Sequence, residues 1–184
     1  MTTLASGQTG PYCKMNLMGA LSGLAMSPRR WFAESFPGVT PREAGGMLLL
    51  ASLFYAAVGA LPMSGTGTLV RAGILLANAL GMTVLHAAMG WLVCTAVGGR
   101  RIRFASIWMV FAIGTSPTLL IAWIPFTFFF TEPWRWVLVA LGMIYGLGMG
   151  KLRTVLILLI AGSLTSLLML SILRLVGSPI LPAV

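Results

Sequence analysis

Five long apolar runs set the strongest limit on how this chain folds. They cover residues 44–62, 72–98, 104–130, 134–150 and 154–176. A hydrocarbon core about 30 Å thick takes about 20 helical residues to cross, and each run is close to or beyond that length. Only 8% of the residues are charged and the mean hydropathy is +0.97, which is far from a soluble domain. The sequence therefore predicts an all-α integral membrane protein with a bundle of five transmembrane helices.

The predicted domain organisation follows from the positions of these runs. Residues 1–43 form a cytoplasmic N-terminal arm, residues 44–176 the five-helix transmembrane domain, and residues 177–184 a short C-terminal tail. The connections between runs are short, which favours one bundle over two separate domains.

The charged residues predict the orientation of the bundle. Twelve Lys and Arg stand against three acidic residues, a net charge of +9. In a soluble protein this balance favours nucleic acid, but here the positive charges lie mainly at the ends of apolar runs, where they set topology and attract anionic lipid headgroups. We therefore expect the lipid bilayer as a partner and no nucleic acid. An N-terminus in the cytoplasm puts nine of the cations inside (Lys14, Arg29, Arg30, Arg42, Arg100, Arg101, Arg103, Lys151 and Arg153) and three outside (Arg71, Arg135 and Arg174).

The N-terminal arm contains a second membrane signal. In "MNLMGALSGLAMSPRRWFAESF" the leucines Leu17, Leu21 and Leu24 recur at helical spacing, and Pro28 ends the pattern. This pattern predicts an amphipathic interfacial helix on the inner membrane surface, with a disordered tail as the alternative. Two cationic groups are expected to contact lipid headgroups or a protein partner: Arg29 and Arg30 with Trp31, and Arg100, Arg101 and Arg103.

Small residues recur at four-residue spacing on two of the predicted spans. They are Gly73, Ala77 and Gly81 on the second span, and Gly142, Gly146 and Gly150 on the fourth. Such stripes let neighbouring helices approach closely. They predict helix packing within one subunit, and a seam to a second copy or to another membrane protein is the alternative.

Asn78 and His86 are the strongly polar residues in the middle of the second span. Ionisable groups within a membrane suggest function. The structural alternative is a neutral histidine bonded to a backbone carbonyl or to a serine or threonine of the fifth span (Ser163, Thr165 or Ser166). The chain has a single histidine and no cluster of metal ligands, so the sequence predicts no metal and no cofactor. All three carboxylates lie outside the predicted spans and no nucleophile and base pair is evident, so the chain is not expected to be an enzyme.

Two prolines interrupt the third run, in "GTSPTLLIAWIP". Pro117 and Pro125 each remove a helical hydrogen bond, and in lipid the freed carbonyls require other partners. Hydroxyls beside Pro117 can supply them, so we expect a kink from Gly114 to Pro117. The third span is then a bent helix whose outer end is capped by aromatic residues, with Trp134 and Trp136 anchoring the next helix at the outer interface.

Four segments in this order resemble the Yip1 family of five-span membrane proteins: "SPRRWF", "GGRRIRF", "SPTLLIAWIP" and "EPWRWVLVALGM". The resemblance covers residues 27 to about 176, and Pro117, Pro125, Trp134 and Gly142 match positions typical of the family. The segment "YGLGMGKLR" departs from it, because it lacks the polar residues that usually follow the fourth span.

Eukaryotic members of that family are adaptors that bind Rab-type small GTPases and help to organise vesicle membranes. The resemblance therefore implies a non-enzymatic scaffold or adaptor for membrane components, in a bacterial inner membrane with a periplasmic C-terminus. The alternative is a transporter or channel for a small solute or ion, because proline-interrupted helices and buried polar groups such as Asn78 and His86 often line substrate paths.

Overall fold

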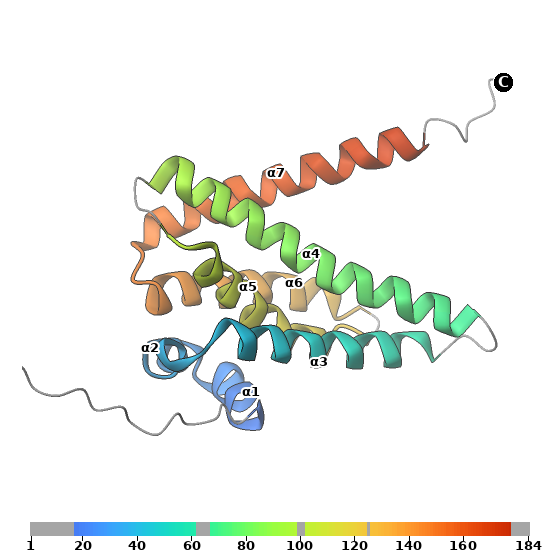
Figure 1. Ribbon diagram of the computed structural model, residues 1–184, viewed down its shortest axis with the longest axis horizontal. Helices are drawn as coiled ribbons and strands as arrows, with labels where there is room; N and C mark the ends of the chain where they lie inside the picture. Colours follow the sequence, from blue (N-terminus) through green and yellow to red (C-terminus); the bar gives the residue numbers. More distant parts are fainter. Residues whose placement is uncertain (1–16, 62–66, 99–101, 125, 178–184) are drawn as a thin grey trace, which may run out of the picture.

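The computed structural model describes residues 17–61, 67–98, 102–124 and 126–177. Within those ranges the chain forms helices and connecting turns, with no strand (Figure 1). The elements are α1 (Leu17–Met26), α2 (Pro28–Glu34), η1 (Phe36–Gly38), α3 (Pro41–Ala60), α4 (Gly67–Gly98), α5 (Phe104–Leu119), α6 (Phe128–Leu141), the π-helical turn η2 (Gly142–Gly146) and α7 (Lys151–Gly177).

Three helices are long and apolar enough to cross a membrane. They are Pro41–Ala60 in α3, Gly67–Val97 in α4 and Lys151–Ile172 in α7, and they match the first, second and fifth predicted runs within a few residues. Helix α3 begins at a capping box: the Thr40 hydroxyl accepts from the Glu43 backbone N–H at 3.2 Å, and the Thr40 backbone N–H donates to the Glu43 carboxylate at 2.8 Å. Pro41 follows at the first helical position, where it loses no hydrogen bond.

The third and fourth predicted spans have the wrong bounds. Helix α5 begins at Phe104 as expected but ends at Leu119, and α6 begins at Phe128. The 16 residues of α5 give a length of about 24 Å, less than the thickness of a hydrocarbon core. Pro117 stands in the last turn of α5, two residues before the helix ends at Leu119. The predicted kink from Gly114 to Pro117 would thus fall near the end of the helix, and it stays a prediction.

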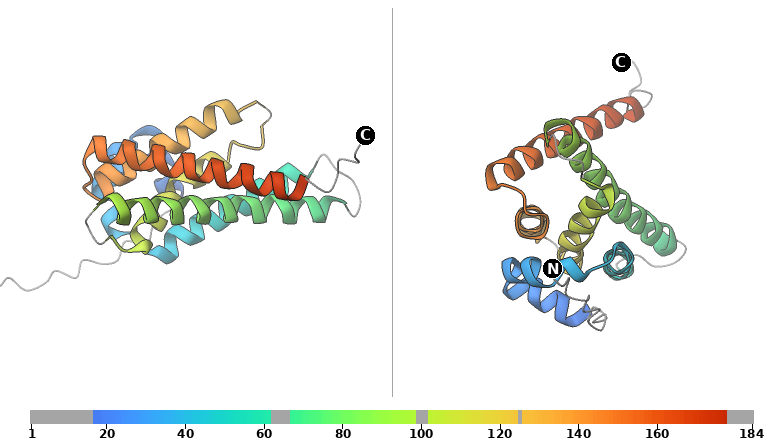
Figure 2. Two further views of the ribbon diagram at one scale, coloured as in Figure 1. Left: turned by 90° about the horizontal axis from the view of Figure 1, so that it is seen from above. Right: turned by 60° about the vertical axis from the view of Figure 1, so that its left-hand side comes forward.

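Helix α5 is the centre of the bundle. Ten of its 16 residues are buried, and it packs against α3, α4 and α6. Helix α7 packs mainly on α4 and has little contact with α6, so much of its leucine-rich surface is exposed. Figure 2 shows α6 diverging from α7 toward the end of α6 that carries Phe128.

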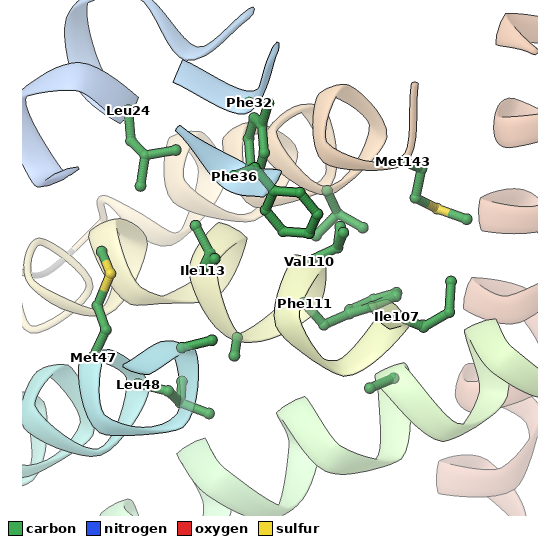
Figure 3. Close-up of a cluster of buried hydrophobic side chains, with 14 of the residues drawn as sticks. Leu24, Phe32, Phe36, Met47, Leu48, Ile107, Val110, Phe111, Ile113 and Met143 are labelled. Atoms are coloured by element: carbon green, nitrogen blue, oxygen red, sulfur yellow. The ribbon is translucent and has the colours of Figure 1, made fainter. Parts of the chain in front are cut away.

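The N-terminal helices α1 and α2 pack against the bundle. Leu24 and Phe32 are fully buried, and Trp31 and Phe36 are 8% and 4% exposed. Figure 3 shows Phe32 and Phe36 above Val110 of α5. The predicted contact of Trp31 with lipid or a partner is therefore wrong, because its ring is covered by protein. Arg29 and Arg30 are exposed as expected, and Arg30 pairs with Glu34 at 3.0 Å.

Two glycines of the fourth run, Gly142 and Gly146, pack against the rings of Phe32 and Phe36. A Cβ on Gly142 would lie 2.7 Å from Val110 Cγ1 and 2.9 Å from Phe32 Cε1, and one on Gly146 would lie 2.7 Å from Phe36 Cδ1. Gly142 and Gly146 belong to the π turn, and Gly150 lies beyond it. A Cβ added to Gly150 would meet no described atom within 4 Å. The predicted three-glycine face is therefore wrong at Gly150, since the backbone leaves the α-helical path at Gly142.

The small residues of α4 have a different environment. Gly73, Ala77 and Gly81 are exposed, and a Cβ on either glycine would meet no described atom within 4 Å. Their predicted packing within one subunit is thus absent from the described part of the chain. The alternative of a seam to another copy or protein stays a prediction.

Candidate functional site

A cavity of about 1160 Å³ lies among α4, α5, α6 and α7, with Tyr55 contributed by α3. Its walls combine aliphatic side chains with an imidazole, an amide, a carboxylate, a guanidinium and several hydroxyls. The cavity is open to the outside, since the lining residues Ser163 and Ser166 of α7 are exposed. Its position follows from the packing above, because α7 lies against α4 and leaves α6 largely uncovered.

An ion pair on α6 faces this cavity. Arg135 Nη2 lies 2.7 Å from Glu132 Oε2, and the two side chains are 15% and 32% exposed. From the sequence, Glu132 was placed outside the spans and Arg135 among the outer topology charges. The only sequence signal for the pair is the three-residue spacing, which brings the two side chains together on one face of a helix.

His86 lies at the α4 wall of the cavity and is 7% exposed. Its Nδ1 is 2.7 Å from the carbonyl oxygen of Met82, one turn earlier in the same helix. A carbonyl only accepts, so Nδ1 carries a proton in this contact, and in the neutral imidazole Nε2 is then an acceptor. The structural alternative predicted a backbone carbonyl or a hydroxyl of the fifth span as the partner, and the structure has the backbone carbonyl of Met82 on α4.

Trp136 joins His86 to the ion pair. Its ring meets the His86 ring edge to face, with centroids 5.3 Å apart, and the Phe111 ring in the same way at 6.5 Å. The guanidinium carbon of Arg135 lies 5.4 Å from the Trp136 ring centroid. Trp136 therefore packs between α4 and α5, whereas Trp134 is 42% exposed. The predicted role of the two residues as anchors at the outer interface stays a prediction.

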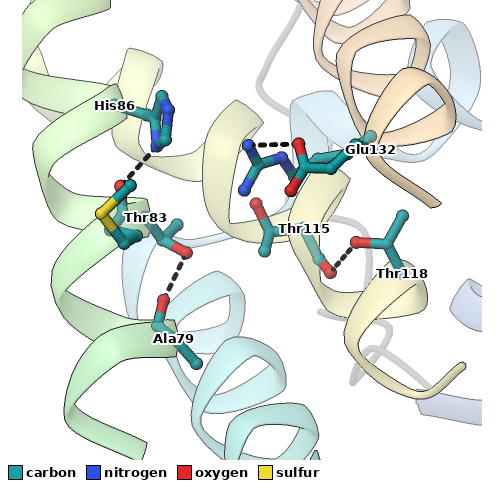
Figure 4. A network of polar contacts seen from close by, with 8 residues as sticks. Ala79, Thr83, His86, Thr115, Thr118 and Glu132 are labelled. Carbon is teal, nitrogen blue, oxygen red and sulfur yellow. Dashed lines mark hydrogen bonds and ion pairs between the residues drawn. The ribbon is translucent and has the colours of Figure 1, made fainter. Parts of the chain in front are cut away.

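Several hydroxyls of the cavity wall are committed to their own helices. Thr83 donates to the Ala79 carbonyl at 2.8 Å, Thr118 to that of Thr115 at 2.7 Å, and Thr165 to that of Ala161 at 2.9 Å. All three residues line the cavity, and their oxygens keep lone pairs as acceptors. Figure 4 shows Thr83 and His86 on α4 facing the ion pair and Thr115.

Residues on both sides of Pro117, namely Thr115, Thr118 and Leu119, line the cavity. Ser116 donates to the Ala112 carbonyl at 2.7 Å and Thr118 to the Thr115 carbonyl at 2.7 Å. Neither bond reaches the carbonyl of Ile113, which Pro117 leaves without its helical donor. Gly114 allows a close approach of α6, because a Cβ there would lie 2.9 Å from Val139 Cγ2. Pro125 lies outside the described residues, and Phe126 after it has a φ of 69°.

The remaining predicted residues divide between the cavity and the ends of helices. Asn78 lines it and is exposed. Arg103 is exposed just before α5, whereas Arg100 and Arg101 lie outside the described residues. The described residues contain no group of three or more His, Cys, Asp or Glu that could hold a metal ion.

Comparison with protein-family models, with curated proteins and with solved structures found no match to this chain. The cavity and its residues therefore carry the functional argument.

Proposed function

We propose that this chain is a non-enzymatic membrane protein that binds a small solute inside its helix bundle and moves it, as a transporter or channel does. The single observation behind this proposal is the cavity of about 1160 Å³, with a carboxylate, a guanidinium and an imidazole in its walls. Polar and ionisable groups in membrane-spanning bundles typically lie on solute paths. The short α5 and the turn after it give a discontinuous helix at the same place, a common feature of such paths.

A five-span arrangement with a cytoplasmic N-terminus and a periplasmic C-terminus, in a bacterial inner membrane, belongs to this proposal. Helices α3, α4 and α7 cross the membrane, and the α5–α6 hairpin supplies two further, shorter crossings beside them. Fusing an alkaline phosphatase reporter after Val184 should give periplasmic activity, and a cytoplasmic reporter at the same point should be inactive. Two termini on the same side of the membrane would overturn the five-span arrangement.

The transport proposal is tested by flux into vesicles that contain the purified protein. Protons, sodium, chloride, glycerol and glycine serve as probes. At least one should cross faster than in protein-free vesicles, and Ser163→Phe should reduce that flux to about a tenth or less, because the ring occupies the cavity. The matched control is Ser171→Phe on the same helix, where an exposed serine lies outside the cavity.

His86→Ala should also reduce the flux. Equal rates in vesicles with and without protein for every probe would contradict the transport proposal, as would equal flux in the Ser163 and Ser171 variants.

A scaffold or adaptor role of the Yip1 type is the second candidate. It is supported by the exposed small-residue stripe Gly73, Ala77 and Gly81 on α4, which contacts no described helix. Small residues on an exposed helix face are typical of seams between membrane helices. The resemblance to the Yip1 family and the exposed cations Arg29, Arg30 and Arg103 agree with a surface that meets lipid headgroups or other membrane components.

This candidate predicts that Gly81→Leu disrupts self-association. Cross-linking in native membranes should give a dimer for the unmodified chain and about tenfold less for the variant, because the new side chain keeps the helices apart. Gly150→Leu is the control, since that glycine also has open space around it but lies off α4. If the unmodified chain and the Gly81→Leu variant are both monomeric, and no other protein is cross-linked to α4, the proposed interface on α4 is rejected.

A further inference from the structure

We propose that the cavity selects a zwitterion, a ligand with a primary ammonium group and a phosphate or carboxylate group close together. This inference rests on the proposed function, because it names the class of ligand for the same cavity. In this arrangement Arg135 binds the anionic group and Glu132 binds the ammonium group.

The charge balance of the cavity supports this choice. Among its described lining residues the ionised groups are one guanidinium and one carboxylate, and they form a pair with a contact of 2.7 Å. A simple anion that took Arg135 would leave Glu132 without its counter-ion in a mostly apolar setting, and a simple cation would do the same to Arg135. Unpaired charges in such surroundings are strongly unfavourable. A zwitterion leaves both protein charges compensated and adds no net charge.

The donors and acceptors of the lining residues suit both ends of such a ligand. The ion pair uses Nη2 of Arg135 and Oε2 of Glu132, so each group keeps further donor or acceptor positions. His86 offers Nε2 as an acceptor, and Thr83, Thr118 and Thr165 present oxygen lone pairs, because their protons are held by backbone carbonyls. An ammonium group has three donors and needs several such acceptors. Acceptors of this kind do not suit a ligand that carries only an anionic group.

The rest of the cavity suits the remainder of the ligand. Its volume of about 1160 Å³ exceeds what a single small zwitterion fills. The α7 wall contributes Val155, Leu158 and Leu159, and the cavity is open where α7 has little contact with α6. Two sources therefore offer this chemistry: the headgroup of an aminophospholipid that enters between α6 and α7, or a water-soluble zwitterion.

The test is a binding titration of the full-length protein in detergent, followed by thermal unfolding. Four probes vary the charge and the source independently: dioctanoyl phosphatidylethanolamine, dioctanoyl phosphatidylglycerol, phosphoethanolamine and glycerol phosphate. The two lipids form one pair and the two water-soluble compounds the other, and each pair contains one zwitterion and one anion. In at least one pair the zwitterion should bind at least about tenfold more tightly than the anion. Preference within the lipid pair alone identifies a lipid headgroup, and preference within the soluble pair alone identifies a free solute.

Charge neutralisation locates the site. Arg135→Gln and Glu132→Gln should each remove the tenfold preference, whereas Arg30→Gln and Glu34→Gln should leave it unchanged, because that ion pair is exposed on α2. Equal or tighter binding of the anions by the unmodified protein would overturn the proposal even if a cavity variant fails to fold. An anion preference combined with flux that Ser163→Phe blocks would overturn the zwitterion assignment and leave the proposed function standing.

Discussion

Phe32→Ala should lower the free energy of unfolding by about 3–5 kcal/mol, the range for removing a large buried aromatic side chain. Phe32 is fully buried, and its ring packs beside Trp31 and Phe36 at centroid distances of 5.3 and 5.8 Å. The loss would leave a cavity between α2, α5 and η2. Thermal unfolding in detergent, followed by circular dichroism, measures the change.

Phe130→Ala is the matched control for that experiment. Phe130 is 79% exposed on α6, so the same substitution removes little buried surface and should change stability by less than about 0.5 kcal/mol. Equal destabilisation by the two variants would contradict the docking of α2 against the bundle.

Gly142→Leu should destabilise the protein by about 1–3 kcal/mol or more, the range for overpacking a filled core. The new Cβ alone would overlap Val110 Cγ1 at 2.7 Å and Phe32 Cε1 at 2.9 Å, and both neighbours are buried. Gly73→Leu is the control, since no described atom lies within 4 Å of its added Cβ, and its unfolding temperature should be nearly unchanged.

A double-mutant cycle makes this prediction sharper. Gly142→Ala should be less destabilising in a Phe32→Ala background than in the unmodified protein, because one of the two overlaps is removed. Additive effects would show that Phe32 and Gly142 are not in contact, and an unchanged melt for Gly142→Leu would contradict the packing around η2.

The sequence predicted the bounds of the long helices within a few residues, but it did not predict where the short helices begin and end. Continuous apolar runs bounded by charge predicted α3, α4 and α7 within a few residues, because burial in lipid imposes length and apolarity on each span. The same reasoning extended the third run to residue 130, although α5 ends at Leu119. Hydropathy does not distinguish an apolar helix from an apolar turn, so it carried the prediction past the proline-containing last turn.

The sequence likewise singled out some residues of the candidate site and missed others. His86 and Asn78 stood out in the sequence as polar groups in an apolar run, and both line the cavity. Glu132 and Arg135 looked like charges at the membrane edge, because their position in the sequence does not reveal which way the start of α6 faces. Their pairing follows from the three-residue spacing on α6, whereas their place in the cavity wall follows from the packing of the helices.

The sequence by itself determined that the chain is helical, and it gave the bounds of the three long apolar helices within a few residues, although it predicted five crossings. Those properties depend on local composition and on the spacing of residues along one helix. Only the tertiary structure decided that Trp31 and Phe32 face protein, that Gly142 receives an aromatic ring, and that Glu132 and Arg135 share a cavity. Lipid and protein interior are equally apolar, so hydropathy cannot tell which of them covers a side chain.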